Sequence, residues 1–175
     1  MAAALWRVRG LRGGQPGAVP LWARLCVDET KLGLARRFGA THVIHARTED
    51  AVERIREITG GGAPWAIDAV GSPATMQQAV SALRPTGTMV AVGLNRVDAT
   101  FAVPINELVQ QQKRIVGALY GASNPRIDLP RIFALYLAGR LPLGELVTSR
   151  RPLDEVNDAY ADLRSGAVGR TVLMP

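Results

Sequence analysis

Few side chains in this sequence could do chemistry, and they do not gather along the chain. His42 and His45 are three residues apart, so they point to different faces of a strand, and no third metal ligand lies nearby. Cys26 is the single cysteine, which excludes an intramolecular disulfide and cannot by itself make a cysteine-based zinc site. Asp68 is a candidate acid inside an apolar run. We therefore predict no metal site and name no catalytic residue.

Two apolar runs that each end in glycine are more informative. Residues 65–70 lead to Gly71, and residues 88–92 lead to Gly93. Runs that are apolar on both faces are typical of parallel strands covered by helices. Both glycines are therefore expected at one edge of one sheet, the edge where open α/β sheets bind ligands. We predict the functional site at that edge.

A helix is predicted between these two strands. Ser72 can cap its first turn, and Pro73 suits its first position because the missing N–H has no partner there. One face of the helix recurs at helical spacing and is predicted to be buried: Met76, Ala79, Val80 and Leu83. The helix is expected to break at residues 84–87. Residues 65–93 therefore form a predicted βαβ unit.

The rest of the chain alternates short apolar runs with helical patterns. The expected strands are 25–27, 41–45, 115–120, 146–149 and 171–174. The expected helices are 31–38, a helix from Thr48 or Glu49 to the glycines at 60–62, 104–112, 129–138 and 154–164. Strands that alternate with helices of about ten residues are typical of a doubly wound α/β sheet. We predict an α/β fold with a parallel, Rossmann-like sheet.

The first 25 residues fit neither a helix nor a strand, because they contain four glycines, two prolines and four arginines. Their glycines do not have the G-x-G-x-x-G spacing of a dinucleotide loop, and no strand is predicted before them. A mitochondrial presequence and a basic arm for nucleic acid or anionic lipid are alternatives. We favour a poorly ordered, basic leader over residues 1–26.

Charge and hydropathy argue against two classes of partner for the body of the chain. The net charge of +6 arises largely from the leader, because residues 1–27 hold four arginines and no acid. We therefore predict no nucleic-acid partner. No apolar run approaches the roughly 20 residues that cross a bilayer, so no membrane partner is predicted either. A cytoplasmic location is the expectation.

From Val27 to the C-terminus the chain resembles the zinc-dependent medium-chain alcohol dehydrogenases. The resemblance rests on the order and spacing of several motifs: KLGLARRFGATHVI at 31–44, DAVG at 68–71, residues 87–93, GALYG at 117–121 and LRSGAVGRTVL at 163–173. It implies that residues 27–122 form a partial dinucleotide-binding domain that is incomplete at its first βα unit. Residues 123–175 would pack on a catalytic domain, which the resemblance implies is missing here.

The same resemblance implies a binding site for a nicotinamide dinucleotide. Ala69 and Val70 would line the nicotinamide pocket, and Gly93 and Leu94 would sit beside the nicotinamide and its ribose. A glycine at position 93 would let the backbone approach the ligand closely.

Further contacts are implied for other parts of the cofactor. Ala118 and Tyr120 match backbone positions that bond the carboxamide, and Arg170 matches the basic residue that meets the pyrophosphate. Lys31 matches the lysine near the adenosine ribose.

An acidic residue for the adenosine ribose is expected near the start of this region. Without a gap in the alignment Cys26 falls at that position, and a small shift gives the role to Asp28. Asp28 followed by Glu29 favours NAD over NADP, because a carboxylate repels a 2′-phosphate.

The departures from the family pattern determine the functional expectation. The phosphate loop is absent or replaced by the leader, and the zinc ligands expected in full-length relatives are absent. Relatives would transfer hydride from an alcohol to NAD, with zinc as the Lewis acid. We expect this chain to be altered at its start and inactive alone.

Two alternatives remain open. The chain could be a non-catalytic binding or dimerisation module, because residues 101–103 and 115–120 match segments near the family's subunit interface, which also makes a homo-oligomer an expectation. It could also be a relative of the zinc-free quinone or enoyl reductases.

Overall fold

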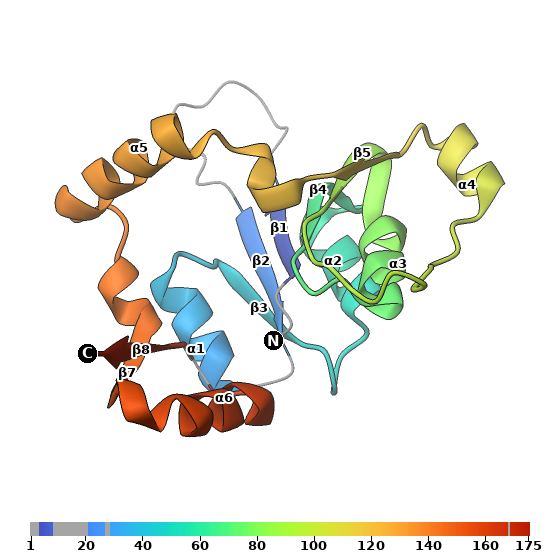
Figure 1. Ribbon diagram of the computed structural model, residues 1–175. Helices are drawn as coiled ribbons and strands as arrows, with labels where there is room; N and C mark the ends of the chain where they lie inside the picture. Colours follow the sequence, from blue (N-terminus) through green and yellow to red (C-terminus); the bar gives the residue numbers. More distant parts are fainter. Residues whose placement is uncertain (1–3, 9–20, 27–28, 168) are drawn as a thin grey trace. The chain divides into compact units, whose positions relative to one another are not determined.

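The computed structural model describes residues 4–8, 21–26, 29–167 and 169–175 (Figure 1). The chain forms two compact units, Met1–Ala122 and Ser123–Pro175. Each unit has its own sheet. None of the helices in the described part is both long and apolar enough to cross a membrane.

The first unit is built on a six-stranded sheet with the strand order β3-β2-β1-β4-β5-β6. Its strands are β1 (Ala4–Val8), β2 (Leu21–Cys26), β3 (His42–His45), β4 (Ala63–Asp68), β5 (Leu83–Ala91) and β6 (Arg114–Gly117). The pairs β2–β3, β4–β5 and β5–β6 are parallel. This order is that of the Rossmann sheet, which confirms the predicted α/β, Rossmann-like fold.

The central strand β1 differs from the prediction. We expected no strand before the glycines of the leader, whereas Ala4–Val8 forms β1 and β2 begins at Leu21. β1 runs antiparallel to both β2 and β4, and Ala4 pairs with Leu25 and Asp68. An open edge on β2 or β4 would leave backbone groups unpaired, and β1 satisfies both edges. The sheet is therefore mixed at its centre rather than wholly parallel.

Four helices accompany this sheet: α1 (Glu29–Arg37), α2 (Ala51–Thr59), α3 (Pro73–Ser81) and α4 (Ile105–Gln110). α2 begins later than Thr48 or Glu49, because the carboxylate of Asp50 caps it by accepting from the N–H groups of Val52 and Glu53. It ends at Gly60, which is in the left-handed conformation with φ 67°.

The predicted start of α3 is confirmed. The Ser72 hydroxyl accepts from the Thr75 N–H, and Pro73 occupies the first turn. The strand after α3 begins earlier than predicted, at Leu83 instead of Thr88. The pairing register of β4 and β5 shifts between Ala63 and Trp65, so residues 84–87 form a bulge within β5 rather than a separate break.

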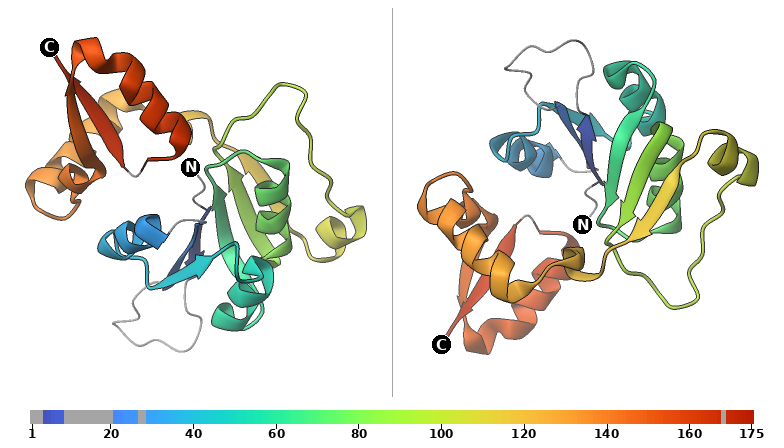
Figure 2. Two further views of the ribbon diagram at one scale, coloured as in Figure 1. Left: turned by 90° about the horizontal axis from the view of Figure 1, so that it is seen from below. Right: turned by 90° about the horizontal axis from the view of Figure 1, so that it is seen from above.

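The core of the first unit lies between the sheet and its helices. α2 and α3 pack against each other and against β4 (Figure 2). Ile44, Ile55 and Met89 are the largest fully buried apolar side chains. Many of the remaining core residues are alanines, including Ala66 and Ala79, and such small side chains let helix and sheet approach closely. Met76 packs against this cluster from α3, as predicted.

The second unit holds a two-stranded parallel sheet and two helices. Its elements are α5 (Pro125–Leu137), the 3-10 turns η2 (Leu143–Leu146) and η3 (Leu153–Glu155), β7 (Val147–Pro152), α6 (Val156–Ser165) and β8 (Arg170–Met174). The Arg151 guanidinium donates to Glu155 and Asp162, each at 2.8 Å, and these acids hold the pKa of Arg151 above its ordinary value. α5 begins earlier than predicted because Asn124 caps it and accepts from the Arg126 N–H.

Candidate functional site

A cavity opens at the carboxyl edge of β4 and β5, where the sequence predicts the site. It has a volume of about 340 Å³ and lies among the turn after β4, the start of α3 and the loop after β5. Its lining residues are Gly71, Pro73, Met76, Gly93, Leu94, Asn95, Arg96, Val97, Ala99, Thr100 and Phe101. The capped start of α3 and the parallel pairing of β4 with β5 fix the two sides of this cavity.

The two glycines predicted at this edge lie against each other. A Cβ on Gly93 would stand 2.2 Å from the Gly71 nitrogen and 2.5 Å from the Val70 carbonyl carbon. Gly71 has φ +82°, and a Cβ there would stand 2.6 Å from the Leu94 carbonyl oxygen. Both positions therefore require glycine because two backbone segments cross. This close approach is to the protein's own chain, and the expected approach of Gly93 to a ligand stays a prediction.

Asp68 holds the crossing of the two backbone segments through hydrogen bonds. Its side chain is fully buried, and its Oδ2 accepts from the Gly71 N–H at 2.7 Å. Its main-chain carbonyl accepts from Val92 at 2.8 Å and from Gly93 at 3.0 Å. Its Oδ1 has no hydrogen-bond partner among the described residues. Asp68 thus binds the ends of both strands and is not placed where a ligand could reach it.

Four of the predicted site residues come together at this edge. Ala69 is exposed and Val70 is half-buried in the turn after β4, and they adjoin the Gly71–Gly93 crossing. Leu94 lines the cavity with its side chain 79% exposed. These residues offer apolar contacts and backbone groups to a ligand.

Two further predicted residues follow β6, the neighbour of β5. The Ala118 N–H donates to the Ala91 carbonyl at 2.9 Å, so any hydrogen bond from the Ala118 backbone to a ligand has to use its carbonyl. Tyr120 lies in the turn η1 (Leu119–Ala122), where its φ of 49° is in the left-handed region and its side chain is exposed.

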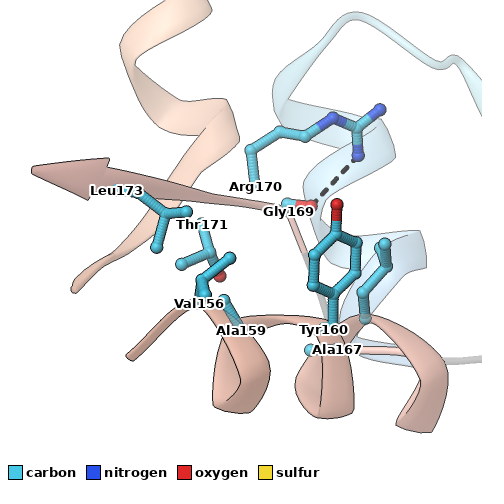
Figure 3. A pocket seen from close by; sticks show the side chains of 9 residues that line it. Val156, Ala159, Tyr160, Ala167, Gly169, Arg170, Thr171 and Leu173 are labelled. Carbon is cyan, nitrogen blue, oxygen red and sulfur yellow. Dashed lines mark hydrogen bonds between the residues drawn. The ribbon is translucent and has the colours of Figure 1, made fainter. Parts of the chain in front are cut away.

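The remaining predicted residues lie elsewhere. Lys31 is half-buried on α1, and Asp28 lies outside the described residues. Arg170 begins β8 in the second unit and donates from Nη1 to the Gly169 carbonyl at 3.0 Å (Figure 3). It borders a largely apolar pocket of about 230 Å³ between α6 and β8, beside Tyr160.

The two histidines bind neighbouring hydroxyls. His42 Nδ1 lies 3.1 Å from the Thr41 hydroxyl, and His45 Nδ1 lies 3.2 Å from the Thr48 hydroxyl. In the described part of the chain, no three histidine, cysteine, aspartate or glutamate side chains gather as a metal site. These residues do not fit a catalytic zinc, which takes three protein ligands, so no chemical step is derived through one.

The model of the zinc-binding dehydrogenases matches residues 23–136. The chain belongs to this family. Among its relatives, the NDMA-dependent alcohol dehydrogenase of Amycolatopsis methanolica is 36% identical over 144 residues, which are 80% of this chain and 38% of that protein. The chain thus spans about two-fifths of the length of the curated relatives it matches.

Solved structures of the family share the fold. Benzyl alcohol dehydrogenase from Acinetobacter calcoaceticus superposes with a TM-score of 0.82 at 35% identity, over 85% of this chain and 41% of that one. An alcohol dehydrogenase zinc-binding domain protein from Burkholderia ambifaria has the same TM-score at 36% identity, over 86% of this chain and 41% of its own. The family match confirms the resemblance found in the motifs.

Sequence reasoning located the edge but missed one residue that builds it. Asn95 donates from Nδ2 to the Gly71 carbonyl at 2.8 Å and accepts the Arg96 N–H on Oδ1 at 2.8 Å. Its only sequence signal is an amide-bearing residue two positions after a strand-ending glycine, which is common in loops.

Proposed function

We propose that this chain binds a nicotinamide dinucleotide at the carboxyl edge of β4 and β5, with NAD preferred over NADP, and that it does not oxidise an alcohol on its own. The observation that carries the proposal is the cavity at this edge. The contact between Gly71 and Gly93 brings the turn that holds Val70 next to the loop that holds Leu94. Ligands of open α/β sheets bind at this edge. When bound, the nicotinamide supplies a hydride acceptor.

The chain's own residues would bind and orient the cofactor. Val70 and Leu94 would cover the nicotinamide ring and exclude water from it, and the Ala118 carbonyl would accept from the carboxamide. Lys31 and Asp28 would contact the adenosine ribose, where Asp28 and Glu29 disfavour the 2′-phosphate of NADP. For Arg170, which lies in the second unit, a role at the pyrophosphate rests on the family resemblance alone; a guanidinium can donate to two phosphate oxygens at once.

The direction of β1 predicts weak binding. In the dinucleotide fold, the first parallel strand leads through a glycine turn into a helix whose N-terminus holds the pyrophosphate. Here β1 starts at the ligand edge, since Ala4 pairs with Asp68, and it runs away from that edge. β1 therefore does not deliver such a turn, and we expect a dissociation constant near the upper end of measurable binding, about 1 mM or roughly −4 kcal/mol.

The test is isothermal titration calorimetry of NAD into the whole chain, with sedimentation to establish that the sample is folded and monodisperse. Leu94→Asn is expected to weaken binding at least fivefold, because a neutral polar side chain beside the ring removes the apolar contact without adding an attractive charge. Leu137→Asn on α5 is the matched control, because Leu137 is 82% exposed and belongs to no predicted contact. A folded chain that gives no heat with NAD would overturn the proposal.

A second candidate function, a dimerisation module, is favoured by one observation. β6 is the last strand of its sheet and exposes Ile115 and Val116, which are 40% and 48% exposed. An apolar edge strand is a template for pairing with another chain.

The relatives named above are alcohol dehydrogenases, which favours that activity over quinone or enoyl reduction in the full-length proteins.

A further inference from the structure

Both polar backbone groups of Gly71 are held by side chains from two different parts of the chain. Asp68, the last residue of β4, accepts the Gly71 N–H on Oδ2 at 2.7 Å. Asn95, in the loop after β5, donates from Nδ2 to the Gly71 carbonyl at 2.8 Å. The Gly71 N–H is therefore used within the protein, and the place of Gly71 is set from both sides.

The Asn95 amide is used at both ends by the protein. Nδ2 donates to a carbonyl, and Oδ1 accepts the Arg96 N–H at 2.8 Å. Swapping the two amide atoms would put an oxygen against the Gly71 carbonyl and a donor against an N–H, so only this orientation fits. Asn95 lines the cavity, and one N–H and one oxygen lone pair of its amide bind the backbone beside the crossing.

Asp68 also determines the place of Gly93, through its main-chain carbonyl. The Asp68 carbonyl accepts from the Val92 and Gly93 N–H groups, and the Gly93 backbone touches Val70 and Gly71 without room for a Cβ. Val70 and Leu94, which flank the two glycines, are therefore located by the hydrogen bonds of Asp68 and Asn95.

We infer that Asp68 and Asn95 are positioning residues for the nicotinamide end of the dinucleotide. The inference rests on the proposed function and names how its site is held. Asp68 is fully buried and cannot touch a ligand, so it acts through Gly71 and Gly93. Asn95 clamps the turn after β4 to the loop after β5. Losing the clamp separates Val70 from Leu94, and a misplacement of about 1 Å is enough to spoil ligand contacts.

The test is saturation-transfer NMR with NAD, which follows millimolar binding and reports the nicotinamide and adenine protons of one ligand separately. Asn95→Asp keeps an oxygen for the Arg96 N–H but replaces the donor to Gly71 with an acceptor. We expect the ratio of nicotinamide to adenine saturation to fall at least threefold. Asn157→Asp, the same change at an exposed position on α6, is the control and should leave the ratio unchanged. Asp68→Asn, which keeps an acceptor for Gly71, should also stay near the wild-type ratio.

The outcomes separate this inference from the proposed function. If both ends of NAD lose saturation equally in Asn95→Asp, or neither does, the positioning role is wrong while the proposed function stands. If the wild-type chain saturates neither end, the proposed function fails and the positioning role fails with it. A ratio that falls in Asn95→Asp and holds in Asn157→Asp supports the inference, because a general loss of stability would weaken both ends together.

Discussion

Gly93 lies where the loop after β5 contacts the turn after β4, and this position has no room for a larger residue. Gly93→Ala places a methyl group 2.2 Å from the Gly71 nitrogen and 2.5 Å from the Val70 carbonyl carbon. These are backbone atoms that cannot rotate aside, so the strands must shift. We expect a loss of about 1–3 kcal/mol in the free energy of unfolding, measured by urea denaturation.

Gly117→Ala in β6 is the control for this change, since a Cβ there meets nothing within 4 Å. It should alter the free energy of unfolding by less than about 0.5 kcal/mol. Equal effects at the two positions would show that the crossing is not tight in solution.

At the residue scale, the sequence predicts that Gly71 and Gly93 lie at one edge, but not the hydrogen bonds that hold them there. Gly71 and Gly93 were predictable at one edge because each ends an apolar run, and such runs indicate parallel strands. The bond from Asn95 to Gly71 was not predictable, because it joins residues 24 positions apart and exists only once β4 and β5 are paired. The sequence indicates Asp68 as a candidate catalytic acid. In the structure it is fully buried and binds the Gly71 N–H, so it supports the turn after β4.

At the element scale, the sequence predicts a helix start well where a capping side chain or a proline determines it. Ser72 and Pro73 fixed the start of α3 because a cap and a pre-set φ act within one turn. The direction of β1 had no such signal, because strand direction depends on which edges are open when the sheet forms. The early start of β5 likewise depends on the pairing of Leu83 with Ala63 across the bulge.

The edge strand β6 makes a prediction about association. Ile115 and Val116 present apolar side chains on the last strand of the sheet, where a second copy could pair. Val116→Lys should weaken any self-association at least tenfold in sedimentation velocity, because a charged side chain on an edge opposes strand pairing. Val109→Lys, at a more exposed apolar residue on α4 outside the sheet, should have no such effect. If both variants self-associate as strongly as the wild-type chain does, β6 is not the interface.

At the scale of the whole molecule, α5 exposes many apolar side chains. Every residue of α5 is at least partly exposed, including Phe133 and Leu137, although the helix is rich in apolar side chains. A helix that is apolar on all sides is normally buried. In the relatives, which are more than twice as long as the matched region, further chain is available to cover such a surface.

The last prediction concerns turnover by the whole chain. With NAD, a primary alcohol and added Zn²⁺, we expect no NADH absorbance above a reaction without protein, even where NAD binding is detectable. A catalytic zinc takes three protein ligands, and in the part of the chain that the structure describes no three histidine, cysteine, aspartate or glutamate side chains gather. His42 and His45 each lie beside a threonine hydroxyl on a short strand and do not converge. Without a Lewis acid, the alkoxide that must lose hydride is not stabilised. NADH formation that requires the chain and stops with a chelator would contradict this prediction. If NADH forms with the wild-type chain and also with the double variant His42→Ala, His45→Ala, the catalytic group is neither of these two side chains.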